Sequence, residues 1–273
     1  MAATNAIVTR GFDLFFAPFA RATPWLGLAA VSLVSGIVLL LVFRYTSNQR
    51  AIRATKDRIV AHLLEVVLYR DELRVVLRAQ VGVIRDSVRY LGHTTLPLVC
   101  LALPVGLLLV QIDLRYGHRP LRVGEPAVVA VRLRPGGGSL DSVSVWAPQG
   151  LQVQTAGLRI PAEREVDWRI VGAAPGAYDL NVVAGGHTIT KRVVIGPGRR
   201  RVSVARVQDG WRRQFLHPGE PPLPHPGPIE SVRISYPSAS LPLLNWRVHW
   251  VWPWLLLSMA FGYALRGPLR VQV

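Results

Sequence analysis

The sequence predicts an α+β membrane protein with three transmembrane helices, a cytoplasmic helical hairpin and an extracytoplasmic immunoglobulin-like β-sandwich. Three observations lead to this fold class. Half of the 273 residues are hydrophobic and only 18% are charged, against about 25% in soluble domains. The apolar residues form three long runs, which is typical of membrane helices. A valine-rich segment with strand periodicity lies between the second and third runs, which predicts a separate β domain.

The first apolar run covers residues 24–43 and contains no charge. About 20 apolar residues cross a hydrocarbon core of roughly 30 Å, so this run predicts the first transmembrane helix. The preceding segment, residues 1–23, places four phenylalanines around single charges, which is typical of a segment lying in the membrane interface. The run ends at Phe43-Arg44-Tyr45 instead of a small-residue cleavage site, which argues against a cleaved signal peptide.

The second and third runs are shorter. Residues 95–112 include Pro97 and Pro104, which membrane helices tolerate because neighbouring groups satisfy the freed carbonyls. Residues 250–265 begin with three tryptophans in alternate positions, as in an interfacial aromatic belt. We interpret both as spans, followed by a short tail at residues 266–273. A buried or re-entrant segment is the alternative for the third run because of its length.

A cytoplasmic helical hairpin is expected over residues 44–94. Ten basic and five acidic residues accompany two apolar series at helical spacing. A single straight helix of this length would extend about 75 Å, yet both ends must return to the same membrane face. The chain is therefore expected to reverse near residues 69–72, with the two apolar stripes facing each other. These stripes comprise Ile52, Ile59, Leu63 and Val66, and then Leu73, Leu77, Val81, Ile84, Val88 and Leu91.

The β domain is predicted over residues 121–207, where short alternating segments are separated by Pro- and Gly-rich turns. Six or seven strands of this kind indicate a small immunoglobulin-like sandwich. Trp146 and Trp168 are its candidate core residues. Residues 208–249 are rich in proline and are predicted to be a linker, with one further possible strand at residues 231–236. The expected strands cover residues 127–133, 142–146, 165–171, 178–183 and 188–195.

Few residues suggest catalysis or cofactor binding. The glycines at 136–138 lack the Gly-Lys-Ser/Thr ending of a phosphate-binding loop. His217, Glu220 and His225 stand among prolines without a recognised metal-ligand spacing, and Cys100 is the only cysteine. We therefore expect a protein that is not an enzyme and that has no catalytic residues, no cofactor and no metal.

The basic residues outnumber the acidic ones by 32 to 16, which favours anionic partners. Arg199, Arg200 and Arg201 form one cluster that could contact anionic lipids. No specific nucleic acid is expected as a partner. The lipid bilayer itself is the principal partner that the apolar runs predict.

The order of parts resembles the YidC membrane insertase superfamily, three-span branch, with an added β domain between spans two and three. The matching pieces are residues 24–43 followed by Arg44-Tyr45-Thr46-Ser47-Asn48-Gln49, the arm to His93, the span from Thr95, and the closing run 250–266. In that family the three spans enclose a partly polar groove that receives client transmembrane segments. The resemblance implies a membrane insertase or membrane chaperone whose partners are nascent membrane proteins.

The polar residues available to line such a groove are few, and each also has a structural explanation, such as helix packing for serines and snorkelling for an arginine at a span end. The alternative function is a non-catalytic, membrane-anchored envelope protein whose β domain binds partners. A polar cavity would favour the insertase, and buried serines would favour the anchored protein. The candidate groove residues are Ser32, Ser35, Arg44, Gln111 and Ser258.

The charge distribution predicts the orientation. Nine Lys and Arg residues lie within fifteen residues of the span ends on the arm side, and six lie on the other side. Because cytoplasmic loops carry the excess of basic residues, the arm and the carboxyl terminus are expected in the cytoplasm. The β domain is then outside the cytoplasm, with the protein in a bacterial inner membrane.

Overall fold

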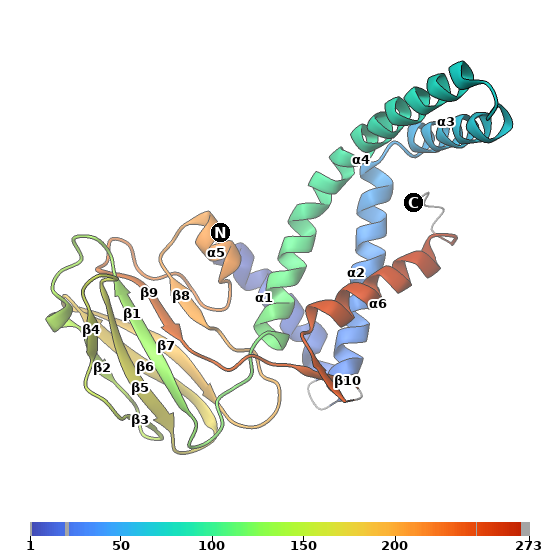
Figure 1. Ribbon diagram of the computed structural model, residues 1–273. Helices are drawn as coiled ribbons and strands as arrows, with labels where there is room; N and C mark the ends of the chain where they lie inside the picture. The colour runs from blue at the N-terminus through green and yellow to red at the C-terminus, as the bar shows by residue number, and fades with distance from the viewer. Residues whose placement is uncertain (1, 20–21, 244, 269–273) are drawn as a thin grey trace. The chain divides into compact units, whose positions relative to one another are not determined.

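The computed structural model is an α+β protein and describes residues 2–19, 22–243 and 245–268 (Figure 1). The chain divides into two compact units. We call residues 2–27 and 109–252 the β unit, and residues 28–108 and 253–268 the helical unit. Helices α2 (Pro24–Thr46) and α4 (Leu73–Tyr116) each contribute residues to both units.

Helices α2 and α4 are each long and apolar enough to cross a membrane, in agreement with the first two predicted runs. Many of their apolar side chains are exposed, including Leu96, Leu98, Val99 and Leu103. Exposed apolar surface of this extent is what a lipid-facing helix requires. Helix α6 (Val251–Leu265) is shorter, with 15 residues, which correspond to about 22 Å.

The arm is a pair of helices. Helix α3 (Gln49–Leu68) begins at Asn48, whose side chain accepts a hydrogen bond from the Ala51 N–H at 3.1 Å and thereby caps the helix. It ends at Leu68, and α4 begins at Leu73, so the reversal lies where the sequence predicts it. Figure 1 shows α3 beside the first part of α4. Helix α4 then continues without a break through the predicted boundary between arm and span at residues 94–95.

The predicted contact between the two apolar stripes of the arm is wrong. The residues of the α4 stripe, from Leu73 to Leu91, have exposed fractions between 53% and 71%. Ile52 of the α3 stripe is buried, but the other protected positions of the arm are held by smaller or polar residues, among them Thr55, Ala79 and Asp86. A Cβ atom on Gly82 would lie 2.7 Å from Nε2 of His62, so α3 and α4 approach closely at this glycine. The face of α4 that contains Gly82 is therefore the one that packs against α3.

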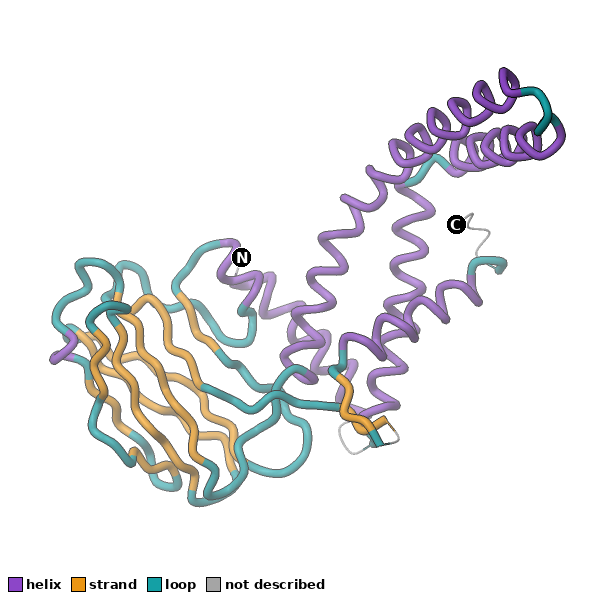
Figure 2. The backbone as a smooth tube through the Cα atoms, viewed as in Figure 1, coloured by secondary structure: helices purple, strands orange, loops and turns teal. Residues whose placement is uncertain are grey.

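The β unit contains two main antiparallel sheets, visible as the orange strands in Figure 2. The first has the order β3-β5-β1-β9-β8, with β4 also paired to β5, and the second has the order β2-β6-β7. A separate hairpin, β10 (Leu241–Leu243) with β11 (Trp246–Val248), precedes α6. The strands of the two main sheets are β1 (Pro126–Leu133), β2 (Ser144–Trp146), β3 (Leu151–Val153), β4 (Leu158–Ile160), β5 (Glu165–Gly172), β6 (Gly176–Ala184), β7 (His187–Ile195), β8 (Ala205–Val207) and β9 (Ile229–Ile234).

One hydrophobic core joins the two sheets. Buried side chains alternate along β1 and β5 of the first sheet and along β6 and β7 of the second, as expected for sheets with one covered face. Val131, Ile170 and Leu180 are examples from the shared cluster. Trp168 is a core residue as predicted, whereas Trp146 is 69% exposed and its prediction is wrong.

The predicted end of the β domain at Val207 is also wrong. Strand β9 pairs with both β1 and β8, so part of the predicted linker at residues 208–249 lies inside the first sheet. Ile234 is fully buried, and the Tyr236 hydroxyl accepts a hydrogen bond from the Val194 N–H at 3.0 Å. The sheet therefore continues to Ile234 and its core to Tyr236.

The remaining short helices belong to the β unit as well. They are α1 (Ala2–Phe16), η1 (Ala17–Phe19), η2 (Leu140–Ser142) and α5 (Trp211–Leu216). The Asn5 side chain of α1 donates a hydrogen bond to the Gln214 carbonyl of α5 at 2.9 Å. The amino-terminal segment that the sequence assigns to the membrane interface thus also has protein contacts.

Candidate functional site

A groove lies between α2 and α6 within the helical unit. Its volume is about 410 Å³. Gly36 allows the helices to cross closely, because a Cβ there would lie 2.9 Å from the Ser258 carbonyl oxygen and 3.2 Å from the Gly262 nitrogen. The lining consists of Gly36, Leu39, Leu40, Phe43, Leu101, Trp254, Leu255, Ser258, Met259, Gly262, Tyr263 and Arg266.

The groove is lined mostly by apolar side chains, and the predicted serines contribute little to it. Ser32 and Ser35 are fully buried and do not line it. The Ser35 hydroxyl accepts a hydrogen bond from Trp254 Nε1 at 3.3 Å. Of the predicted groove residues, only Ser258 is part of the lining, and its hydroxyl has no hydrogen-bond partner among the described residues.

The two other predicted groove residues lie elsewhere. Gln111 belongs to the β unit, where its amide donates a hydrogen bond to Thr9 Oγ1 at 3.0 Å. The Arg44 guanidinium lies 5.9 Å from the ring centroid of Tyr45 and does not line the groove. The structure therefore does not bring the five predicted residues together into one groove.

Sequence reasoning missed the cation that does line the groove. Arg266 follows α6, and its guanidinium lies 3.8 Å from the ring centroid of Tyr263. The close packing of α2 and α6 also has a signal in the sequence. Ser32 and Gly36 on α2 are small residues four positions apart, and Ser258 and Gly262 on α6 have the same spacing. This spacing is typical of helix pairs that pack closely in membranes.

The arm presents a second apolar surface. Asp86 of α4 lies between the two helices of the arm as a fully buried carboxylate, and its Oδ1 accepts a hydrogen bond from Arg89 of the same helix at 3.1 Å. The other carboxylate oxygen lies 3.5 Å from Nε2 of His62 on α3. These contacts hold polar groups between the helices and leave the α4 stripe, from Leu73 to Leu91, on the outside. An apolar stripe on an exposed helix is a surface to which another apolar segment can bind.

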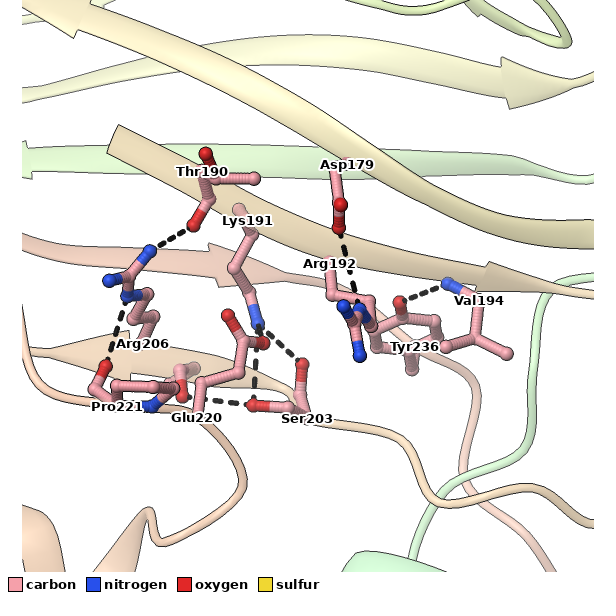
Figure 3. Close-up of polar contacts among 11 residues, drawn as sticks. Asp179, Thr190, Lys191, Arg192, Val194, Ser203, Arg206, Glu220, Pro221 and Tyr236 are labelled. Atoms are coloured by element: carbon pink, nitrogen blue, oxygen red, sulfur yellow. Dashed lines mark hydrogen bonds and ion pairs between the residues drawn. The ribbon is translucent and has the colours of Figure 1, made fainter. Parts of the chain in front are cut away.

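A buried ion pair occupies the β unit (Figure 3). Lys191 on β7 is fully buried and pairs with Glu220, while its ammonium group donates a hydrogen bond to the Ser203 carbonyl at 2.7 Å. Burial lowers the pKa of Lys191, and the charge of Glu220 opposes that change. Arg206 donates a hydrogen bond to the Pro221 carbonyl at 3.0 Å. These contacts attach the segment around Glu220 to β7.

The same ion pair includes one of the candidate metal ligands that the sequence analysis considered in the proline-rich segment, His217, Glu220 and His225. Glu220, one of the three residues considered from the sequence, is engaged by Lys191. Within the described ranges, no group of three or more His, Cys, Asp and Glu residues is placed to hold a metal ion. The Lys191 ammonium lies 2.7 Å from the Ser203 carbonyl oxygen and 3.4 Å from the Ser203 hydroxyl.

In comparisons with known proteins, no family model, no curated protein and no solved structure matches this chain.

Proposed function

We propose that this protein is a membrane insertase or membrane chaperone-like protein that receives client transmembrane segments in the groove between α2 and α6. The observation that carries the proposal is the groove itself, an apolar hollow of about 410 Å³ between two apolar helices. Such a surface can bind part of an apolar helix by van der Waals packing. No chemical step is needed for this role.

The arm supports the same role. Its outward stripe offers exposed leucine, valine and isoleucine side chains, and arginines such as Arg74, Arg78 and Arg85 lie in the same part of α4. An amphipathic helix of this composition can hold an apolar client segment before it enters the bilayer. The arm joins α2 after only a few residues and continues directly into the apolar part of α4.

The short third helix supplies the physical basis for insertion. In this proposal α2, α4 and α6 all span the membrane. A helix of about 22 Å is shorter than a typical hydrocarbon core of roughly 30 Å, so the bilayer is expected to thin around it. Thinning lowers the cost of moving the polar flank of a client across the bilayer. Arg266 lines the groove and would attract acidic flanks.

The proposal includes an orientation. The arm and the carboxyl terminus lie in the cytoplasm, and the β unit, as an immunoglobulin-like sandwich, lies outside the cytoplasm of a bacterial inner membrane. Cysteines introduced at Arg70 and Gln149, both exposed, should react from opposite sides of the membrane in a Cys100→Ser background. Gly137 is a poorer position, because a Cβ there would lie 2.5 Å from the Pro228 carbonyl oxygen. Labelling of both cysteines from one side would contradict this orientation.

One observation favours the alternative of a non-catalytic, membrane-anchored envelope protein whose β unit binds partners. Ser32 and Ser35 are buried, which leaves the groove with few polar groups. A purely anchoring set of helices would pack in this way. The two functions differ in whether the groove is occupied by client segments.

An insertion assay in reconstituted vesicles separates them. Short-tailed client membrane proteins should insert faster in the presence of the full chain, and Gly262→Phe should reduce this gain severalfold. Among the described residues, and apart from the backbone of α6 itself, a Cβ at Gly262 would meet Leu40 alone within 4 Å, at 3.9 Å, so the larger ring can occupy the groove. Gly92→Phe is the matched control, since a Cβ there meets nothing within 4 Å and Gly92 does not line the groove. Equal insertion with and without the protein would reject the insertase function.

A further inference from the structure

A second cleft lies within the β unit, between the amino-terminal helices and the loop that follows β7. Its volume is about 550 Å³. Phe16 and Phe19 line one part, and residues 198–201 line another. Arg115 and Tyr116, the last two residues of α4, also line it. The cleft therefore combines aromatic and strongly basic surfaces.

The cleft carries an excess of positive charge. Four arginines line it, at positions 115, 199, 200 and 201, and Asp13 is the one carboxylate in the lining. Asp13 is already engaged at both oxygens: Oδ1 lies 2.5 Å from Arg115 and Oδ2 lies 2.7 Å from Arg201. The four arginines and one carboxylate give the lining a net charge of +3, and Arg199 and Arg200 have no carboxylate partner in it, which favours an anionic ligand.

Two of these arginines have unused hydrogen-bonding capacity. Arg199 lies over the ring of Tyr116 at 4.9 Å, and its Nη2 donates a hydrogen bond to the Ser240 carbonyl at 3.4 Å. Its Nη1 is buried without a hydrogen-bond partner among the described residues. A buried guanidinium nitrogen without an acceptor is costly. Arg200 is exposed, and it makes no hydrogen bond or ion pair within the described part of the chain. Arginine is well suited to bind phosphate oxygens in pairs.

The cleft lies at the start of α2 and the end of α4, and this position favours the phosphate group of a phospholipid as the anionic ligand. Tyr116 ends α4 and Pro24 begins α2, and the Tyr116 hydroxyl donates a hydrogen bond to the Pro24 carbonyl at 3.1 Å. Both residues line the cleft. Because α2 and α4 are the two helices in the described part of the chain that are long and apolar enough to span a membrane, their adjoining ends would lie at the depth of the phospholipid head groups.

We infer that this cleft binds the phosphate of an anionic phospholipid head group, with Arg199 and Arg200 as its principal ligands. Phe16 and Phe19 provide apolar surface for the glycerol and the first part of the acyl chains. Arg115 and Arg201, fixed by Asp13, hold the surrounding positive charge in place. This inference does not depend on client insertion, because the cleft belongs to the β unit.

Native mass spectrometry of the full chain in detergent tests the inference, with phosphatidylglycerol and phosphatidylcholine as probes. The chain should retain phosphatidylglycerol in preference to phosphatidylcholine. The double variant Arg199→Gln/Arg200→Gln should bind phosphatidylglycerol at least about tenfold more weakly, because charge-assisted hydrogen bonds are lost. The matched control is Arg169→Gln/Arg233→Gln, which removes two exposed arginines outside this cleft and should leave the affinity unchanged.

Two results would overturn the inference. One is equal retention of phosphatidylglycerol by the wild-type chain and the Arg199/Arg200 variant. The other is binding of soluble glycerol phosphate with no preference for phosphatidylglycerol, which would assign the cleft to free phosphate compounds. Arg200→Lys, which keeps the charge, should retain most of the affinity, and circular dichroism of each variant checks that the β unit remains folded.

Discussion

Replacing Glu220 with glutamine should destabilise the β unit by about 3–5 kcal/mol, because it leaves a buried lysine charge without its partner. Lys191 is 0% exposed and the Glu220 side chain is 11% exposed. Lys191→Met should cost less, because Glu220 keeps some contact with water and lines a cleft with four arginines, at positions 192, 200, 201 and 206. The double variant Lys191→Met/Glu220→Gln should recover most of the loss, since it removes both charges.

The pH dependence of the Glu220→Gln variant follows from the direction of the lysine pKa. Burial lowers the pKa of Lys191 below its ordinary value of 10.5, and loss of the carboxylate lowers it further. The unfolded state then binds more protons than the folded state, so the free energy of unfolding rises with pH. The penalty of Glu220→Gln should therefore shrink as the pH rises from neutrality towards 10.5.

Thermal unfolding of the full chain in detergent, followed by the circular dichroism of the β-sheets, measures these changes. The wild type, both single variants and the double variant form a complete cycle. A Glu220→Gln variant as stable as the wild type at neutral pH would refute the reasoning. A penalty that grows with pH would refute it as well.

Two further predictions concern the same unit. Arg119 donates hydrogen bonds to Glu125 and holds the pKa of that carboxyl at about 2, so the stabilisation from this pair is present above the ordinary pKa of 4.5 and is lost as the pH falls towards 2. Because both side chains are partly exposed, we expect about 1–2 kcal/mol, absent in Glu125→Gln and measurable by acid unfolding. Ile234→Ala, at a fully buried position of β9, should cost about 2–5 kcal/mol in urea unfolding. Leu158→Ala, at an exposed position, should cost less than about 0.5 kcal/mol, and equal losses would contradict the placement of β9 in the core.

Uninterrupted apolar runs and alternating strands allowed much of the fold to be predicted. The absence of charge over residues 24–43 is a property of the local sequence, and α2 covers that run. The charged cluster at residues 69–72 likewise marks the turn of the arm, although neither glycine nor proline is present there. In both cases the pattern that determines the structure lies within a few turns of chain.

The errors arise where distant residues decide the packing. Which face of α4 pairs with α3 depends on the room at Gly82 and on the buried carboxylate of Asp86, whereas apolar periodicity alone favoured the opposite face. The place of β9 depends on its pairing with β1, about a hundred residues earlier in the chain. Gln111 was a plausible groove residue by its position in an apolar run, but Thr9 is its partner, and sequence spacing does not reveal that contact.

Site-specific photo-crosslinking from the groove to newly made membrane proteins tests the proposed insertase function most directly. A photoreactive residue at Met259, which lines the groove, should form crosslinks with client transmembrane segments. Leu256, on the same helix, is equally exposed but does not line the groove, and it should form few. Equal crosslinking from both positions, or none from Met259, would contradict the proposal that clients enter between α2 and α6.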